Sequence, residues 1–119
     1  MKNQPFHRRI RFALNGFRTA FKSESSFRTQ CFFAAGALLL LVVLRAKPIW
    51  WGLVLITISV VLAAELFNTA LEFVIDRLHP EQHPAIAMAK DCAAGAVLVL
   101  SFASLGLVGA LLWDWFMGS

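Results

Sequence analysis

Charge is scarce in this sequence, and its scarcity excludes the commonest class of protein. Asp, Glu, Lys and Arg make up 15% of the 119 residues, whereas hydrophobic residues make up 59%. Soluble domains carry about a quarter charged and about half apolar residues. The composition therefore argues against a soluble domain. It predicts an integral membrane protein, with residues 1–119 forming a single domain.

Cysteine is also scarce, and the phosphate-binding motifs of common enzyme classes are missing. Cys31 and Cys92 form no CxxC pair and have no His at metal-ligand spacing, which argues against a zinc site. The sequence contains neither a GxxxxGK[ST] loop nor the glycine-rich loop of protein kinases. Any phosphate transfer by this chain must therefore use a different phosphate-binding site.

Acidic residues are nearly missing from the first 28 residues, which hold seven Lys or Arg and a single acid, Glu24. Such a basic arm can bind nucleic acid, but an anionic lipid surface explains it better because hydrophobic sequence follows directly. Apolar side chains recur in the arm at three- and four-residue steps, at Phe6, Ile10, Ala13, Leu14, Phe17 and Phe21. This periodicity predicts an amphipathic helix at about residues 5–24 that lies flat on a membrane surface, with an unstructured basic flank as the alternative.

Three apolar stretches follow the arm, and we expect each to cross the membrane, at about residues 26–46, 48–75 and 90–117. The HPEQHP segment at 79–84 should interrupt the helices between the second and third spans, because its prolines lack an amide hydrogen. Lys and Arg are concentrated in the arm, so the positive-inside rule places the amino terminus in the cytoplasm. The arm, the end of the second span and the start of the third then meet at the cytoplasmic surface.

The second span ends in a polar stripe that is unusual for a membrane helix. At 100° per residue, an arc of roughly 80° contains Glu65, Asn68, Glu72 and Asp76. Carboxylates inside a membrane are costly unless they face a polar partner, which makes them candidates for function. The alternatives are a solvated helix end for the last two residues and a helix–helix contact through the first two.

Further polar residues should meet this stripe at the cytoplasmic surface. Glu24 and Arg28 precede the first span, and Lys90 and Asp91 begin the third. Carboxylates suit Mg²⁺, which proteins usually hold with one or two carboxylates together with substrate phosphates. Neighbouring cations would balance the charge of a transferred phosphoryl group, and Glu65 would accept the proton of an attacking hydroxyl group. The pattern therefore points to phosphoryl transfer.

Three motifs occur in a specific order and spacing. They are E-S-S-F-R at 24–28, E-x-x-N-T-A-x-E-x-x-x-D at 65–76 and H-P-x-x-x-x-A-K-D at 83–91. Together they resemble the bacterial integral-membrane diacylglycerol kinases over nearly the whole chain. The resemblance implies an all-α homotrimer in the bacterial inner membrane, each chain having a surface helix and three spans. It also implies active sites that are shared between subunits and transfer the γ-phosphate of Mg-ATP to a lipid hydroxyl group.

The resemblance further implies roles for individual residues. Glu65 matches the catalytic carboxylate, and Glu24 and Glu72 match the residues that hold the metal ion and ATP. The other implied nucleotide contacts are Lys90, Asp91, His83 and Phe12. The implied contacts to the lipid substrate are Glu65, Asn68, Arg18, Phe27, Arg28 and Ala94.

Departures from the family pattern bear on the lipid acceptor. From Lys90 the chain contains KDCAAGA, where diacylglycerol-specific members commonly have Lys-Asp-x-Gly-Ser-Ala; this is similar to the branch that phosphorylates undecaprenol. Thr29 also replaces a Gln that is usual in the diacylglycerol branch, whereas Arg77 resembles that branch. We expect diacylglycerol as the acceptor and phosphatidic acid as the product, with undecaprenol as the alternative acceptor.

A small transport or ion-conducting subunit is the rival from another class, with Glu65 and Asn68 lining a path for protons or cations. Such a path should continue across the membrane, but residues 49–64 offer only Thr57 and Ser59 as polar side chains. That favours a site open to one side. A purely structural assembly protein is the third interpretation, and it leaves the convergence of charged residues unexplained.

Overall fold

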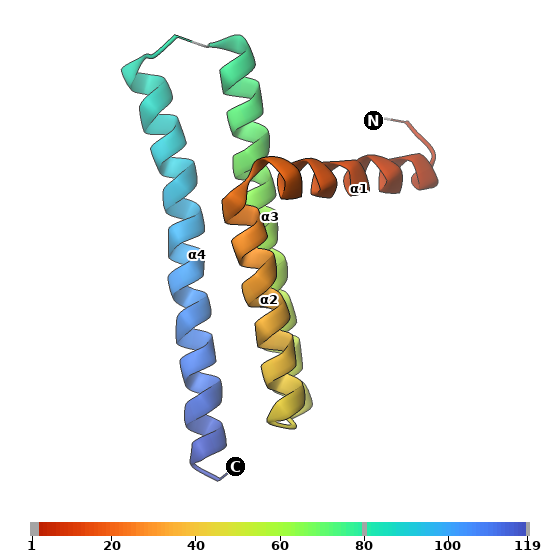
Figure 1. Ribbon diagram of the computed structural model, residues 1–119, viewed down its shortest axis with the longest axis vertical. Helices are drawn as coiled ribbons and strands as arrows, with labels where there is room; N and C mark the ends of the chain where they lie inside the picture. Colours follow the sequence, from red (N-terminus) through yellow and green to blue (C-terminus); the bar gives the residue numbers. More distant parts are fainter. Residues whose placement is uncertain (1–2, 80, 119) are drawn as a thin grey trace.

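The computed structural model describes residues 3–79 and 81–118, and every regular element in these ranges is a helix. The four helices are α1 (Phe6–Ser23), α2 (Ser25–Val43), α3 (Pro48–Leu78) and α4 (Pro84–Phe116). Figure 1 shows α2, α3 and α4 running side by side while α1 leaves the bundle at a steep angle. By length and composition, α2, α3 and α4 can each cross a membrane. The prediction of an all-α chain is confirmed, and three of its helices are long and apolar enough to cross a membrane, as predicted.

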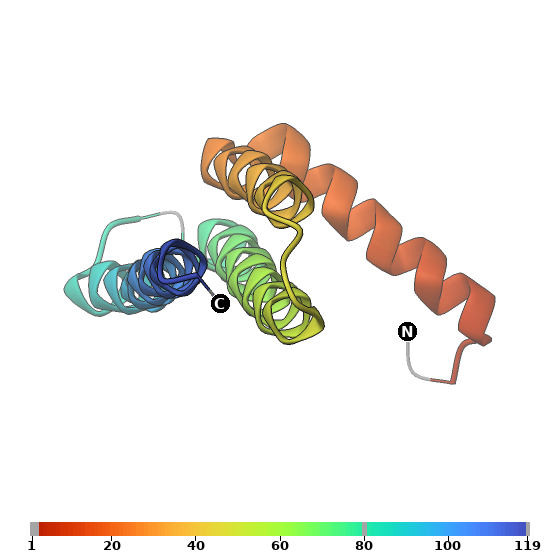
Figure 2. The ribbon, with the colours of Figure 1, turned by 90° about the horizontal axis from the view of Figure 1, so that it is seen from below.

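The helix α3 is the centre of the bundle. It packs against both α2 and α4, and the view along the helices in Figure 2 shows it between them. The best-buried apolar cluster consists of Leu41 of α2, Val54 of α3 and Leu111 of α4. Near this cluster, Trp50 donates a 3.0 Å hydrogen bond from Nε1 to Oδ2 of Asp114, which ties the start of α3 to the end of α4.

The helix α2 is much shorter than α3 and α4, and this difference bears on where the polar end of α3 lies relative to a membrane. At about 1.5 Å per residue, the 19 residues of α2 measure about 28 Å, close to the roughly 30 Å of a bilayer's hydrocarbon core. By the same rise, the 31 residues of α3 and the 33 of α4 measure about 46 and 50 Å. If α2 spans the hydrocarbon layer, both longer helices extend beyond it at the end where the 79–83 loop joins them.

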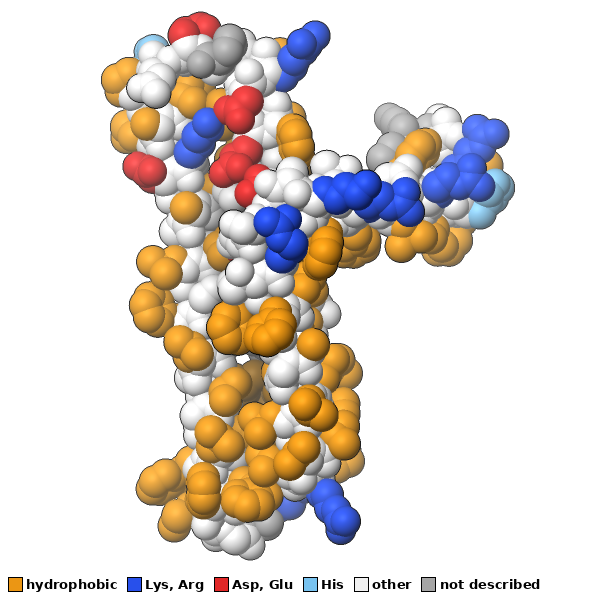
Figure 3. Space-filling model, viewed as in Figure 1, with side chains coloured by type: hydrophobic (Ala, Val, Ile, Leu, Met, Phe, Trp, Pro, Cys, Tyr) orange, Lys and Arg blue, Asp and Glu red, His pale blue; other side chains and the backbone are white. Residues whose placement is uncertain are grey.

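A one-residue break separates α1 from α2. Glu24 has extended backbone angles, φ −121° and ψ 111°, and its N–H still donates to the carbonyl oxygen of Ala20. Ala20 is fully buried where α1 meets α2 and α3. In Figure 3, Lys and Arg side chains gather on the upper side of α1 and hydrophobic side chains on its lower side. The position of α1 on a membrane surface stays a prediction.

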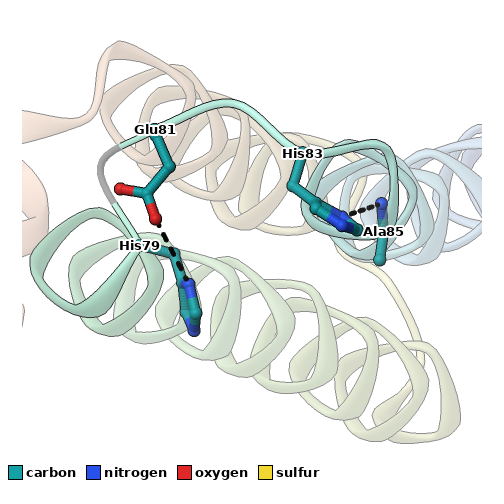
Figure 4. Close-up of polar contacts among 4 residues, drawn as sticks. All are labelled: His79, Glu81, His83 and Ala85. Carbon is teal, nitrogen blue, oxygen red and sulfur yellow. Dashed lines mark hydrogen bonds and ion pairs between the residues drawn. The ribbon is translucent and has the colours of Figure 1, made fainter.

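The interruption between α3 and α4 lies at the HPEQHP segment. The helix α3 ends at Leu78 and α4 begins at Pro84, the last residue of that segment, while the start of the third span near residue 90 stays a prediction. Proline is favoured in the first turn of a helix, since the N–H that it lacks would have no partner there. His83 caps this turn, and its Nδ1 accepts a 3.0 Å hydrogen bond from the N–H of Ala85 (Figure 4). Pro80, the other predicted helix breaker, lies outside the described residues.

Most apolar side chains of the bundle are exposed. Phe32 and Phe67, for example, are each 77% exposed, and hydrophobic atoms cover most of the lower part of the molecule in Figure 3. Apolar patches of this extent are typical of surfaces that contact lipid or another protein chain. The single chain therefore presents a surface suited to a membrane.

Candidate active site

Glu65 is the most deeply buried charged residue among those described. Its side chain is 1% exposed although it stands on a helix that is apolar on most of its surface. Ser26, in the first turn of α2, donates a 2.7 Å hydrogen bond from Oγ to Oε1 of Glu65. Because Ser26 lies where α2 begins, this bond places Glu65 at the same end of the hydrocarbon layer. If α2 spans the hydrocarbon layer, the carboxylate lies near its boundary, and the fold shields it from solvent.

A second carboxylate group lies close to Glu65. Glu24, in the break between α1 and α2, has a raised pKa, first because the side chain is partly desolvated and then because of the neighbouring carboxylate of Glu72. The carboxylate of Glu65 raises the pKa further, whereas the guanidinium of Arg28 lowers it. The fold therefore brings the carboxylate of Glu24 into electrostatic contact with the carboxylates of Glu65 and Glu72 on α3. Figure 3 shows acidic side chains gathered in this upper part of the molecule.

The pair formed by Glu24 and Glu72 fits a magnesium ion that is also held by a phosphate. No group of three metal-ligating side chains occurs within residues 3–79 and 81–118. Mg²⁺ is commonly bound by one or two carboxylates, with waters and substrate phosphates completing its coordination. The two carboxylates, which repel each other, are of the kind that such an ion neutralises.

Polar atoms without partners mark the next turn of α3. Among the described residues, Oδ1 of Asn68 and Oγ1 of Thr69 are buried and have no hydrogen-bond partner. A buried polar atom without a partner costs about 1–3 kcal/mol. These atoms follow Glu65 by three and four residues, so they lie on its side of the helix. The region fits a bound molecule that carries hydroxyl or other polar groups.

Lys90 is held beside the stripe by an ion pair. Its Nζ lies 2.8 Å from Oδ1 of Asp76, linking the first turns of α4 to the last turns of α3. Asp76 is exposed and Lys90 is half-exposed, so solvent screens the pair and a bound anion can compete for the ammonium group.

A hollow of about 500 Å³ opens between the last turn of α3 and the first turns of α4. Lys90 and His83, both predicted to contact the nucleotide, lie on its wall. The remaining lining residues are Asp76, His79, Glu81, Gln82, Pro84, Ile86 and Ala87. Figure 4 shows the loop side chains, with Nδ1 of His79 4.0 Å from Oε1 of Glu81. Most of its lining residues are polar or charged, and Asp76 connects it to the end of the stripe.

Other predicted site residues take different positions. The side chains of Phe12, Arg18, Asp91 and Ala94 are exposed. Phe27, predicted to contact the lipid, is 3% exposed and packs inside the chain. Arg28 donates hydrogen bonds from one guanidinium nitrogen to the carbonyl oxygens of Phe21 and Lys22, at 2.6 and 3.1 Å. In this structure it satisfies free carbonyls at the end of α1.

Two features of the site were not predicted from the sequence. One is the bond between Ser26 and Glu65; the ESSFR motif contains the serine, but only the packing of α2 on α3 brings it to the carboxylate. The other is an apolar groove of about 470 Å³ between α2, α3 and α4, one turn from Glu65 at its nearest point, Leu62. Gln30 of α2 donates a 3.0 Å hydrogen bond to Oγ of Ser101 of α4 at this groove. The sequence offers no signal that pairs these two residues.

Comparison with known proteins gives an independent finding. The profile of the family described as "Prokaryotic diacylglycerol kinase" matches residues 11–112, which include every residue of the predicted site. A protein named diacylglycerol kinase from Haemophilus influenzae is 35% identical over 89 residues, which cover 75% of each chain. The protein of that name from Escherichia coli K12 is 29% identical over 105 residues, covering 88% of this chain and 86% of its own. An undecaprenol kinase from Bacillus subtilis is 31% identical over 91 residues, covering 76% and 73%.

Proposed function

Because the chain belongs to the prokaryotic diacylglycerol kinase family and is a multi-pass membrane lipid kinase, we propose that it phosphorylates diacylglycerol with Mg-ATP. The products would be phosphatidic acid and ADP. The observation that carries this proposal is the burial of Glu65 at one end of the bundle, with Glu24 and Glu72 in electrostatic contact nearby. A shielded base beside a pair of metal-binding carboxylates is what transfer between a lipid and a nucleotide requires.

In the proposed reaction, the hydroxyl oxygen of the lipid attacks the γ-phosphorus of ATP, and Glu65 accepts the proton of that hydroxyl group. The new bond joins that oxygen to phosphorus, and the bond to the β–γ bridging oxygen breaks, so that ADP leaves. Glu24 and Glu72 would hold Mg²⁺, which neutralises charge on the phosphates when it is bound. Lys90 would exchange its ion pair with Asp76 for the phosphates, which it can reach from the same hollow.

The hollow beside the 79–83 loop would take the nucleotide. His83 and Lys90 line it, and Asp91 follows on the same turn of α4. Phe12 would approach the nucleotide from α1. The lipid would bind on the other side of the stripe, where the buried Oδ1 of Asn68 can accept a hydrogen bond from a glycerol hydroxyl group. That surface would be completed by Arg18, Phe27, Arg28 and Ala94.

Assembly would complete the site. We propose a homotrimer in the bacterial inner membrane, with the amino terminus in the cytoplasm and active sites shared between subunits. The exposed apolar surfaces of α2, α3 and α4 are suited to lipid or to neighbouring copies. The basic side of α1 would face anionic headgroups at the cytoplasmic surface.

Undecaprenol is the second candidate acceptor. It is favoured by the similarity to the Bacillus subtilis undecaprenol kinase and by Ala94, which lacks the hydroxyl group that diacylglycerol-specific members commonly carry there. Transport is less well supported. The hydroxyl groups of Thr57, Ser59 and Ser104 each donate to a carbonyl oxygen of their own helix, so their hydrogens are already engaged.

The test is a transfer assay with purified protein and ATP labelled at the γ-phosphate. Diacylglycerol, undecaprenol and ceramide are offered separately in mixed micelles with Mg²⁺. We expect labelled phosphatidic acid at a higher kcat/KM than either other product. Preferred labelling of undecaprenol would assign the chain to the second candidate, and the absence of any labelled lipid would contradict kinase activity.

A further inference from the structure

The hydrogen bond between Ser26 and Glu65 joins two helices at the proposed centre of catalysis. Ser26 stands in the first turn of α2, and Glu65 is 39 residues away on α3. The 2.7 Å distance is within the usual range for a hydroxyl donor and an oxygen acceptor. In this bond the hydroxyl group of Ser26 is the donor and Oε1 of Glu65 is the acceptor.

A carboxylate on a flexible side chain can rotate, and this rotation moves both of its oxygens. A donor fixed on a neighbouring helix stops the rotation by holding one oxygen. Glu65 is 1% exposed, so solvent cannot replace the serine as a donor on this side. With Oε1 held, Oε2 keeps a defined direction. A base held in a defined direction can be placed within reach of the proton that it accepts.

We propose that Ser26 is a positioning residue, which holds Oε1 of Glu65 so that Oε2 faces the hydroxyl group of the lipid acceptor. This rests on the proposed role of Glu65 as the base. Ser26 itself does not touch the reacting atoms. Its removal should therefore slow the transfer step and leave the binding of ATP unchanged.

The chain supplies a matched control next to Ser26. Ser25 is also a serine in the first turn of α2, it is exposed, and it lies on a different side of the helix. Ser25→Ala removes the same hydroxyl group from the same turn and does not disturb the bond to Glu65. Ser26→Thr keeps the hydroxyl group and adds one methyl group at an exposed position.

The experiment compares Ser26→Ala, Ser26→Thr, Ser25→Ala and wild type by initial rates at varied ATP and varied lipid. We expect Ser26→Ala to lower kcat roughly 10- to 100-fold, as small misplacements of catalytic groups do. The KM for ATP and the melting temperature of Ser26→Ala should equal those of Ser25→Ala within experimental error. Ser26→Thr should restore most of the kcat.

Two results would overturn the proposal. One is an unchanged kcat in Ser26→Ala. The other is a loss of kcat, ATP affinity and melting temperature together that Ser26→Thr does not restore, because a role confined to helix packing predicts that combination. Glu65→Gln separates this inference from the proposed function. If Glu65→Gln is inactive and Ser26→Ala is normal, only the positioning role fails; if Glu65→Gln is fully active, the base itself is wrongly assigned.

Discussion

Nζ of Lys90 lies 2.8 Å from Oδ1 of Asp76, so the first turns of α4 and the last turns of α3 are joined by an ion pair at the rim of the loop hollow. The pair gives the ammonium group a fixed starting position beside the proposed phosphate site. It also gives Asp76 a role that does not involve the nucleotide.

Substitutions of the two partners should therefore have different effects. Lys90→Ala should lower kcat/KM for ATP roughly 10- to 100-fold, because a charged hydrogen bond to phosphate is lost. Asp76→Asn should have a much smaller effect, since the ammonium group is still present. Steady-state rates at varied ATP measure both. Equal losses in the two variants would show that the pair is needed as a unit and would contradict the separate roles.

The pair of Glu24 and Glu72 should control the magnesium requirement. Glu24→Gln and Glu72→Gln each remove one carboxylate charge, so the Mg²⁺ concentration for half-maximal activity should rise several-fold in both variants. Titration of activity with MgCl₂ at fixed ATP measures the change.

Asp114→Asn is the matched control for this titration. It also removes one carboxylate, but at the far end of α4, and the amide oxygen can still accept the hydrogen bond from Trp50. Its magnesium requirement should equal that of wild type. A requirement that is unchanged in Glu24→Gln and Glu72→Gln would remove both residues from the metal site.

Stability without metal should depend on pH through Glu24. Its pKa is raised above the ordinary value of 4.5 by desolvation and by the carboxylate of Glu72. The folded state therefore binds this proton more tightly than the unfolded state, which stabilises the fold at low pH. That contribution is lost as the pH rises from about 4.5 through the raised pKa.

Thermal melting in detergent with EDTA, at a series of pH values, measures this contribution. The melting temperature of wild type should fall over that interval, and it should fall less in Glu72→Gln, which lacks the repelling charge. Addition of Mg²⁺ should also reduce the fall. A slope that is the same in wild type and Glu72→Gln would show that the carboxylate of Glu72 does not raise the pKa of Glu24, and a slope that is unchanged in Glu24→Gln would show that Glu24 is not the group responsible.

Arg28 should be important for the joint between α1 and α2. Its guanidinium donates to the carbonyl oxygens of Phe21 and Lys22, so Arg28→Ala should loosen the last turn of α1 at a cost of about 1 kcal/mol. Amide hydrogen exchange measures this loosening, and we expect faster exchange near the end of α1 in Arg28→Ala than in wild type. The KM for the lipid, measured on the same variant, tests its predicted contact with substrate. Unchanged exchange together with a raised KM would assign Arg28 to the substrate alone.

The sequence predicted the helices well because their signals are local. Hydrophobic length defines the spans, and the polar stripe with Glu65 and Glu72 follows from the helical period. The HPEQHP segment predicted the break between α3 and α4 but not which proline begins the next helix, since proline marks a break and a first turn equally well. The contacts of Ser26 with Glu65 and of Gln30 with Ser101 could not be predicted. They depend on how α2 is rotated against α3 and α4, which no local pattern specifies.

The most direct test of the account is the initial rate of phosphate transfer to diacylglycerol by Glu65→Gln beside wild type. The substitution keeps the size of the side chain and an oxygen that can accept the hydrogen bond from Ser26, but it removes the base. We predict a rate reduced by roughly 10²- to 10⁴-fold, with ATP still bound at near wild-type affinity. Transfer by Glu65→Gln at the wild-type rate would contradict the assignment of Glu65 as the catalytic base.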